Sequence, residues 1–160
     1  LVYGGRPALG VIYIPVKKIL YYGTIRNGAY RADHPEYSPD MDFDALENQA
    51  RRLPLDREDP VYTVVASRSH MSSDTEKFID ELKKEHGEVK LTSIGSSIKI
   101  CLVAEGTADI YPRFAPTMEW DTAAGHAIAK AAGKELYHQD GCTPLAYNKE
   151  DLLNPWFIVK

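Results

Sequence analysis

Strand-forming and helix-forming segments alternate from residue 61 to the end of the chain, and this alternation constrains the fold more than any other feature of the sequence. Val61 to Ala66 has the composition of a buried strand, and the run from Ser72 to Thr75 offers N-caps for a helix that Gly87 ends. Such alternation predicts a layered α/β domain, in which ligands usually bind outside strand ends and at helix N-termini. The other expected elements are strands over residues 89–92, 108–111, 135–137 and 156–159, and helices from Gly95 or Ser96 to Ala104 and from Asp121 to Gly133.

The first 32 residues have a different pattern, in which short β-rich runs are separated by turn signals. Strands are expected at Leu9 to Ile14 and at Ile19 to Ile25. The pair Asn27-Gly28 follows the second strand and is a strong hairpin signal, because both residues tolerate the positive φ that a tight turn needs. Residues 1–32 therefore predict an antiparallel β-meander, with Leu1 to Tyr3 as one arm of an initial hairpin.

Residues 33–60 hold four prolines, many charges and few apolar residues in any regular period. This composition predicts an irregular connection with one short helix near Phe43 to Arg51. The chain is therefore expected to divide into a meander, a connection, and an α/β domain over residues 61–160.

Composition and charge exclude several classes of protein. The formal net charge of −4 at pH 7 argues against a nucleic-acid-binding protein, which would usually be basic. No apolar run approaches the about 20 residues of a membrane span, so no transmembrane segment is expected. Cys101 and Cys142 form neither a zinc spacing nor a disulfide framework. A reducing, cytoplasmic setting is the simplest interpretation, with peripheral membrane association left open.

Asp121, at the expected start of a helix, is a candidate metal ligand. The alternative is a simple N-cap, a role for which Asp is among the best residues. The small residues from Thr122 to Gly125 keep the first turn thin, so a ligand or a neighbouring backbone can approach it, and Trp120 could fix the direction of the carboxylate. A hard divalent cation needs several oxygen ligands, so the other ligands must come from elsewhere.

Two turns between strands and helices are candidate ligand loops. In the turn from Ser93 to Ser97, backbone N–H groups around Gly95 can bind an anion, although such turns are also ordinary loops. Lys99 follows within a turn, where a cation is slightly unfavourable unless an anion is bound; a solvent-facing lysine is the alternative. Ser67 and His70 follow the strand at 61–66 and either contact a phosphate or base, or only cap the next helix.

Three other features are interpreted as structural. Glu105-Gly106 has the pattern of a helix C-terminus. His126 is expected to be packed or half-exposed rather than a metal ligand, and Cys101 to be a core residue. The tyrosines of the first 30 residues are interpreted as aromatic side chains on the faces of a sheet.

Several runs of the sequence together resemble one superfamily. They are residues 93–106, Tyr111 to Phe114, the run Trp120-Asp121-Thr122-Ala123-Ala124-Gly125 and Leu153-Asn154-Pro155. These runs resemble the inositol monophosphatase superfamily, and within it the bacterial 3'(2'),5'-bisphosphate nucleotidases. The resemblance implies a magnesium-dependent phosphatase that hydrolyses the 3'-phosphate of adenosine 3',5'-bisphosphate to give AMP and phosphate. Bound magnesium would activate a water for in-line attack and stabilise the leaving oxygen.

The resemblance also implies roles for individual residues. Asp121 matches a metal ligand that lies close to the substrate. Ser67, His70, Gly95 and Lys99 match positions that contact the nucleotide. Lys99 favours a bisphosphate substrate, because a second phosphate is a second anion to neutralise.

One part of the family pattern is missing from the sequence. The run Asp-Pro-x-Asp-Gly-Thr with an upstream Glu, which carries most metal ligands in the family, does not occur. The expectation is therefore that these residues are the C-terminal portion of the fold, an αβα layered domain preceded by a meander left from the N-terminal domain. The remaining Mg²⁺ ligands would lie in the N-terminal half, and the chain alone would hold no complete catalytic set and be inactive.

An open edge of the meander would further allow a homodimer. Two other functions stay open: an inositol or sugar-phosphate phosphatase of the same superfamily, and a non-catalytic nucleotide-binding module.

Overall fold

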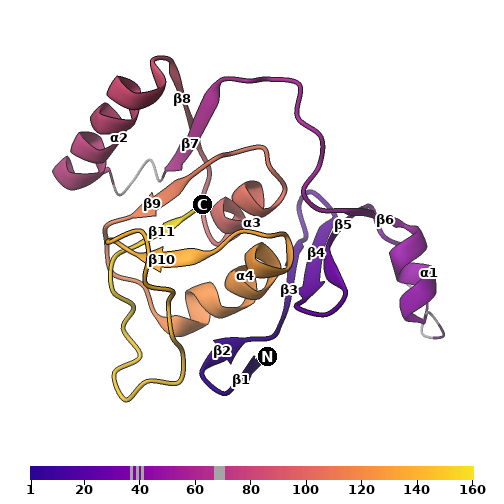
Figure 1. Cartoon of the computed structure of the whole chain (residues 1–160). Coiled ribbons are helices and arrows are strands. Elements are labelled where there is room, and N and C mark those ends of the chain that lie inside the picture. The colour runs from indigo at the N-terminus through magenta and orange to yellow at the C-terminus, as the bar shows by residue number, and fades with distance from the viewer. Residues whose placement is uncertain (37, 39, 41, 67–70) are drawn as a thin grey trace.

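The computed structural model describes residues 1–36, 38, 40, 42–66 and 71–160 (Figure 1). The N-terminal part is an antiparallel sheet with the strand order β3-β4-β5-β6. Its strands are β3 (Leu9–Ile14), β4 (Ile19–Thr24), β5 (Gly28–Asp33) and β6 (Ala50–Arg52). The predicted hairpin between β4 and β5 is confirmed, with residues 25–27 as its turn and Gly28, at φ +92°, as the first residue of β5. Strands β1 (Val2–Tyr3) and β2 (Arg6–Pro7) form the predicted initial hairpin.

The connection after the meander contains more regular structure than its composition indicates. It holds the expected short helix, α1 (Phe43–Asn48), and also strand β6, which pairs with β5. No apolar alternation marks β6 in the sequence. The strand is instead fixed by backbone pairing and by an ion pair of 2.5 Å between the Arg51 guanidinium and the Asp33 carboxylate of β5.

The first strand–helix–strand unit of the α/β part matches the sequence prediction. Strand β7 (Tyr62–Ala66) lies parallel to β8 (Val89–Ser93), and α2 (Ser73–His86) connects them. The Ser72 hydroxyl accepts a hydrogen bond from the Thr75 N–H at 3.2 Å and caps the helix, and Gly87 ends it with φ +76°.

The remaining elements are the strands of the antiparallel C-terminal sheet, which has the order β10-β11-β9, and two helices. They are α3 (Ile98–Ala104), β9 (Tyr111–Arg113), α4 (Glu119–Ala131), β10 (Leu136–His138) and β11 (Phe157–Val159). The predicted starts of three of these elements are wrong by two residues or more. Helix α3 begins after Ser96, whose φ of +63° is left-handed and cannot continue a helix. Strand β9 begins at Tyr111, because Ile110 makes only an isolated bridge to Val64.

The third boundary concerns α4, which begins two residues before Asp121. Met118 takes the N-cap position with extended backbone (φ −106°, ψ 161°), and Asp121 is the third helical residue. The interpretation of Asp121 as the N-cap is therefore wrong, although its side chain does bond to the helix start, as described below.

Helix α4 packs directly against the N-terminal sheet, and Figure 1 shows it between β3 and β10. A Cβ atom on Gly10 of β3 would lie 2.0 Å from the carbonyl oxygen of Ala124, so strand and helix touch through their backbones. A Cβ atom on Gly125 would lie 2.9 Å from Cδ1 of Ile100. The sequence left open whether the thin first turns of α4 admit a ligand or a neighbouring backbone. In the structure these turns are approached by strand β3 and by helix α3.

A buried carboxylate ties the N-terminal sheet to α3. Glu105 is only 2% exposed and accepts hydrogen bonds from the Tyr21 hydroxyl at 2.6 Å and the Arg31 guanidinium at 2.8 Å. Burial and the bond to Glu105 raise the pKa of Tyr21. The sequence placed Glu105 correctly at a helix end, where Gly106 has φ +85°, but gave no sign of these contacts. Buried side chains of the sheet and of α3 and α4 share one core.

None of the helices in the described part of the chain is long and apolar enough to cross a membrane.

Candidate functional site

A cavity of about 440 Å³ lies where the starts of α3 and α4 meet β9 and β11. Its lining is mixed, with two cations, one carboxylate, hydroxyl groups and aromatic rings. The lining residues are Gly95, Ser96, Ser97, Lys99, Ile100, Tyr111, Arg113, Pro116, Thr117, Trp120, Asp121, Thr122 and Phe157. Three residues singled out in the sequence, Gly95, Lys99 and Asp121, therefore line the same cavity. Ser67 and His70 lie outside the residues that the structure describes.

Asp121 holds its carboxylate at the first turn of α4. Its Oδ2 accepts a hydrogen bond from the Met118 N–H at 2.9 Å, and Oδ1 has no hydrogen-bond partner within the described residues. Negative charge at this position is favoured by the helix dipole. One oxygen is thus held by the helix start, while the other remains available to a ligand. The expectation that Trp120 packs and fixes the carboxylate is wrong, since Trp120 is 66% exposed and lines the cavity.

Lys99 is buried beside the turn that precedes α3. It is 4% exposed, and its ammonium donates to the carbonyl oxygens of Ile94 at 3.1 Å and Ser96 at 2.9 Å. The ammonium also lies 5.3 Å from the centre of the Tyr111 ring. Burial and the nearby Arg113 lower the pKa of Lys99. The alternative of a solvent-facing lysine is therefore wrong, and the lysine fixes the turn around Gly95 in addition to lining the cavity.

Arg113 is a second cation in the cavity that the sequence interpretation did not assign to the site. Its Nη2 donates to the Pro116 carbonyl at 3.1 Å, while Nε is buried with no hydrogen-bond partner in the described part of the chain. The sequence did contain a signal for this role of Arg113. Side chains alternate along a strand, so Arg113 lies on the same face of β9 as Tyr111, which also lines the cavity. A buried donor without a partner costs free energy that a bound acceptor would recover.

The cavity contains a single carboxylate among its lining residues, that of Asp121. Within the described ranges, no three or more His, Cys, Asp or Glu side chains are grouped to hold a metal ion. Mg²⁺ takes six ligands and is usually held by one or two carboxylates together with waters and substrate phosphates. The described residues offer one carboxylate, one oxygen of which already accepts from the Met118 N–H, so they do not form a complete magnesium site on their own.

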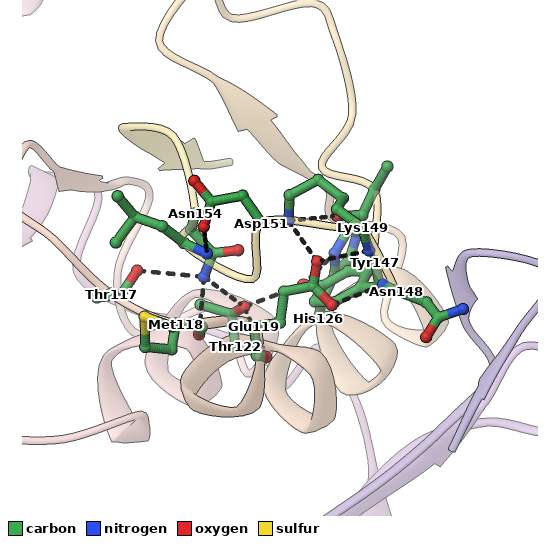
Figure 2. Close-up of polar contacts among 12 residues, drawn as sticks. Thr117, Met118, Glu119, Thr122, His126, Tyr147, Asn148, Lys149, Asp151 and Asn154 are labelled. Carbon is green, nitrogen blue, oxygen red and sulfur yellow. Dashed lines mark hydrogen bonds and ion pairs between the residues drawn. The ribbon is translucent and has the colours of Figure 1, made fainter.

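A hydrogen-bonded network joins side chains of α4 to the segment that precedes β11 (Figure 2). The buried His126 ring bonds to the Tyr147 hydroxyl at 2.9 Å through Nδ1 and to Glu135 through Nε2. His126 is thus a packed histidine, as the sequence predicted. Burial alone would raise the pKa of Glu135, but hydrogen bonds from His126 and Lys130 outweigh it and lower this pKa to about 2.

A second part of this network anchors the helix start to the segment before β11. The Glu119 carboxylate accepts bonds from the Asn148 N–H at 2.6 Å, from the Lys149 N–H at 3.2 Å and from the Lys149 ammonium. Although burial alone would raise the pKa of Glu119, these bonds lower it. The Asn154 amide reaches Met118 and Thr122 from the same segment (Figure 2). Sequence patterns gave no sign of either contact, because the partners are about 30 residues apart.

Comparison with known proteins places these features in a family. Residues 1–156 match the inositol monophosphatase family. The chain is 43% identical, over 99% of its length, to a protein of Salmonella typhimurium named 3'(2'),5'-bisphosphate nucleotidase CysQ, of which it covers 57%. It is 30% identical to the protein of the same name from Aggregatibacter actinomycetemcomitans, covering 99% of this chain and 54% of that protein. The chain thus spans little more than half the length of the curated relatives it matches.

Solved structures show the same fold. The crystal structure of CysQ from Bacteroides thetaiotaomicron, described as a bacterial member of the inositol monophosphatase family, superimposes with a TM-score of 0.94 at 55% identity, covering 99% of this chain and 59% of that one. Inositol monophosphatase II from Staphylococcus aureus shares the fold at a TM-score of 0.63 and 16% identity, covering 99% of this chain and 53% of that one. With residues 1–156 matched and this α/β fold shared, the chain belongs to the inositol monophosphatase family.

Proposed function

We propose that the complete protein is a phosphatase that hydrolyses the 3'-phosphate of adenosine 3',5'-bisphosphate to give AMP and phosphate, with this chain forming part of its active site. The observation that carries the proposal is the cavity that gathers the Asp121 carboxylate with the cations Lys99 and Arg113. Proteins bind phosphate groups through Arg and Lys side chains and through carboxylate-held cations, and a substrate with two phosphates can use both. Relatives 42–43% identical to the chain are named 3'(2'),5'-bisphosphate nucleotidase, which supports the same substrate.

The cavity suggests a division of roles among its residues. Lys99 and Arg113 bind the phosphate that is not hydrolysed. Gly95 leaves space for the nucleotide, because a Cβ atom there would have no neighbour within 4 Å. Ser67 and His70 contact the nucleotide in the same proposal.

Asp121 is proposed as one ligand of magnesium and as a neighbour of the reacting phosphate. If Asp121 and the further ligands held the metal, it would supply a polarised water and charge stabilisation at the leaving oxygen. The described residues give the cavity one carboxylate, and we propose that the other protein ligands come from other parts of the complete protein.

The proposal includes the place of these residues in the whole molecule. We propose that residues 1–32 belong to the sheet of an N-terminal domain, that residues 33–60 connect the two domains, and that residues 61–160 form the C-terminal α/β domain. The coverage of only 54–57% of these curated relatives supports this division.

Substitution of Lys99 tests the proposed substrate. In the complete protein, Lys99→Met is expected to raise KM for adenosine 3',5'-bisphosphate by about 10- to 100-fold, because a charge-assisted hydrogen bond contributes about 1.5–3 kcal/mol. Its effect on adenosine 3'-monophosphate, which lacks the second phosphate, is expected to stay within about threefold. The measurement is steady-state phosphate release from each substrate, with Lys83→Met on the exposed side of α2 as control.

Three outcomes would separate the alternatives. An equal rise in KM for both nucleotides would contradict the role of Lys99 at the second phosphate. Higher kcat/KM for inositol 1-phosphate than for the bisphosphate in the wild-type protein would identify an inositol phosphatase, the alternative that the family match favours. Binding of the nucleotide without turnover of any of the three substrates would identify a non-catalytic module.

The outer edge of the N-terminal sheet is a candidate contact for a second copy of the chain. β3 is the edge strand, and its side chains Leu9, Val11 and Tyr13 are exposed. An apolar edge strand can pair with another strand. We expect the chain to form dimers at high concentration, with Val11→Lys returning it to the monomer in light scattering. A wild-type monomer throughout the concentration series would contradict this homodimer.

A further inference from the structure

Asn154 is a buried polar residue next to the cavity that the proposed function has not yet used. It is 4% exposed and lies in the segment between β10 and β11. The two N–H groups of its Nδ2 are shared among three oxygen atoms at the start of α4: the Met118 carbonyl at 2.8 Å, the Thr122 hydroxyl at 3.1 Å and the Thr117 hydroxyl at 3.2 Å (Figure 2). Its own N–H donates to the Thr117 carbonyl at 2.8 Å. Four contacts from one residue thus converge on a single turn.

These contacts bracket Asp121 on both sides. Met118, whose carbonyl accepts from Asn154, is also the residue whose N–H donates to Asp121 Oδ2. Thr122 follows Asp121 directly, and its hydroxyl donates to the Glu119 carbonyl at 3.2 Å while it also accepts from the Tyr147 hydroxyl. The turn that carries Asp121 is therefore held from outside the helix.

Such external support matters because the first turn of a helix is its least constrained part, where backbone N–H groups have no partners within the helix. A functional carboxylate has to stay within about 0.5 Å of its working position, which requires neighbours that lock the backbone beneath it.

The amide of Asn154 also carries a cost that a purely structural residue would avoid. Its Oδ1 is buried with no hydrogen-bond partner in the described residues. Exchanging the oxygen and nitrogen of the amide would not help, since the Met118 carbonyl would then face an oxygen instead of a donor. The side chain is thus oriented to donate, at the expense of its own acceptor.

We infer that Asn154 is a positioning residue, which fixes the backbone of residues 117–122 and through it the carboxylate of Asp121. The inference rests on the proposed function only in saying that the restraint serves to hold a functional carboxylate. The local restraint itself is independent of that function and can be measured without any turnover.

The test compares variants of the complete protein by amide hydrogen exchange and by kinetics. Asn154→Ala is expected to speed exchange of the Met118 and Asp121 amides by about 10-fold, equivalent to about 1.4 kcal/mol, because both amides lie in the turn that Asn154 contacts, and to leave exchange in β7 and β8 unchanged. It should lower kcat for the bisphosphate by about 10- to 100-fold, the usual effect of losing a residue that orients a ligand, while KM changes less than about threefold. Asn154→Asp keeps the shape but removes the donor, so it should behave like Asn154→Ala.

The control is Ile79→Ala, a cavity-forming change in the separate cluster under α2, which should lower the melting temperature without altering either readout at α4. Wild-type exchange at residues 117–122 in Asn154→Asp would overturn the inference, as would a change in melting temperature with unchanged kcat. Should Asn154→Ala not fold, Tyr147→Phe removes the bonds of this hydroxyl to Thr122 and His126 and should give a smaller effect on the same amides; no effect there would count against the inference. If the wild-type protein hydrolyses no phosphate ester, the proposed function fails, and the exchange measurement still decides whether Asn154 restrains this turn.

Discussion

Asp121→Asn in the complete protein should lower kcat for adenosine 3',5'-bisphosphate by about 100-fold or more and leave the fold intact. Loss of a residue that only orients a metal ligand costs about 10- to 100-fold, so loss of a ligand itself should cost at least as much. The asparagine oxygen can still accept the hydrogen bond from the Met118 N–H, so stability should change by less than the about 0.5–2 kcal/mol that removal of a helix cap costs. Phosphate release at saturating magnesium and thermal unfolding measure the two quantities.

Two companion variants make this result specific. Asp80→Asn removes an exposed carboxylate of α2 far from the cavity and should leave kcat unchanged. Asp121→Ala should lower kcat as strongly as Asp121→Asn and also reduce stability, because the bond to Met118 is lost as well. Near-normal turnover in Asp121→Asn would show that this carboxylate serves only to bond the start of the helix.

Gly10→Ala should destabilise the chain by about 1–3 kcal/mol, the usual cost of overpacking a tight contact, or more. The added Cβ would lie 2.0 Å from the Ala124 carbonyl oxygen, which belongs to the helix backbone and cannot rotate away as a side chain would. Either β3 or α4 has to move, and Ala124 is only three residues from Asp121. Urea or thermal unfolding measures the loss.

Gly95→Ala is the matched control for this substitution. At Gly95 a Cβ atom has no neighbour within 4 Å, so stability should change by less than about 0.5 kcal/mol. A midpoint of unfolding for Gly10→Ala equal to that of the wild type would mean that strand and helix separate more easily than their contact indicates.

The sequence predicted most elements because their apolar residues recur with the period of a strand or a helix. It failed where a boundary depends on an unusual backbone: Ser96 takes a left-handed conformation, and Met118 holds the N-cap position without a capping side chain. Strand β6 was missed because pairing with β5, rather than side-chain alternation, defines it.

The candidate site was predicted in part. Gly95, Lys99 and Asp121 were recognised through local signals, a turn before a helix and a motif at a helix start, and the fold brings them to one cavity. Arg113 and Asn154 were not assigned roles there, because what distinguishes them is a missing partner or a contact with residues far along the chain.

The bond between Tyr21 and Glu105 joins residues 84 positions apart, and this separation has a consequence for synthesis on the ribosome. At about 5–20 residues per second, Glu105 emerges about 4–17 s after Tyr21. During that interval the sheet has neither its buried carboxylate nor α4 against Gly10. Only its hairpins, whose strands are neighbours in sequence, can form at once. The face of these strands that packs against α3 and α4 therefore stays uncovered by them for several seconds, and a chaperone that binds extended apolar segments should be found on the chain in that interval.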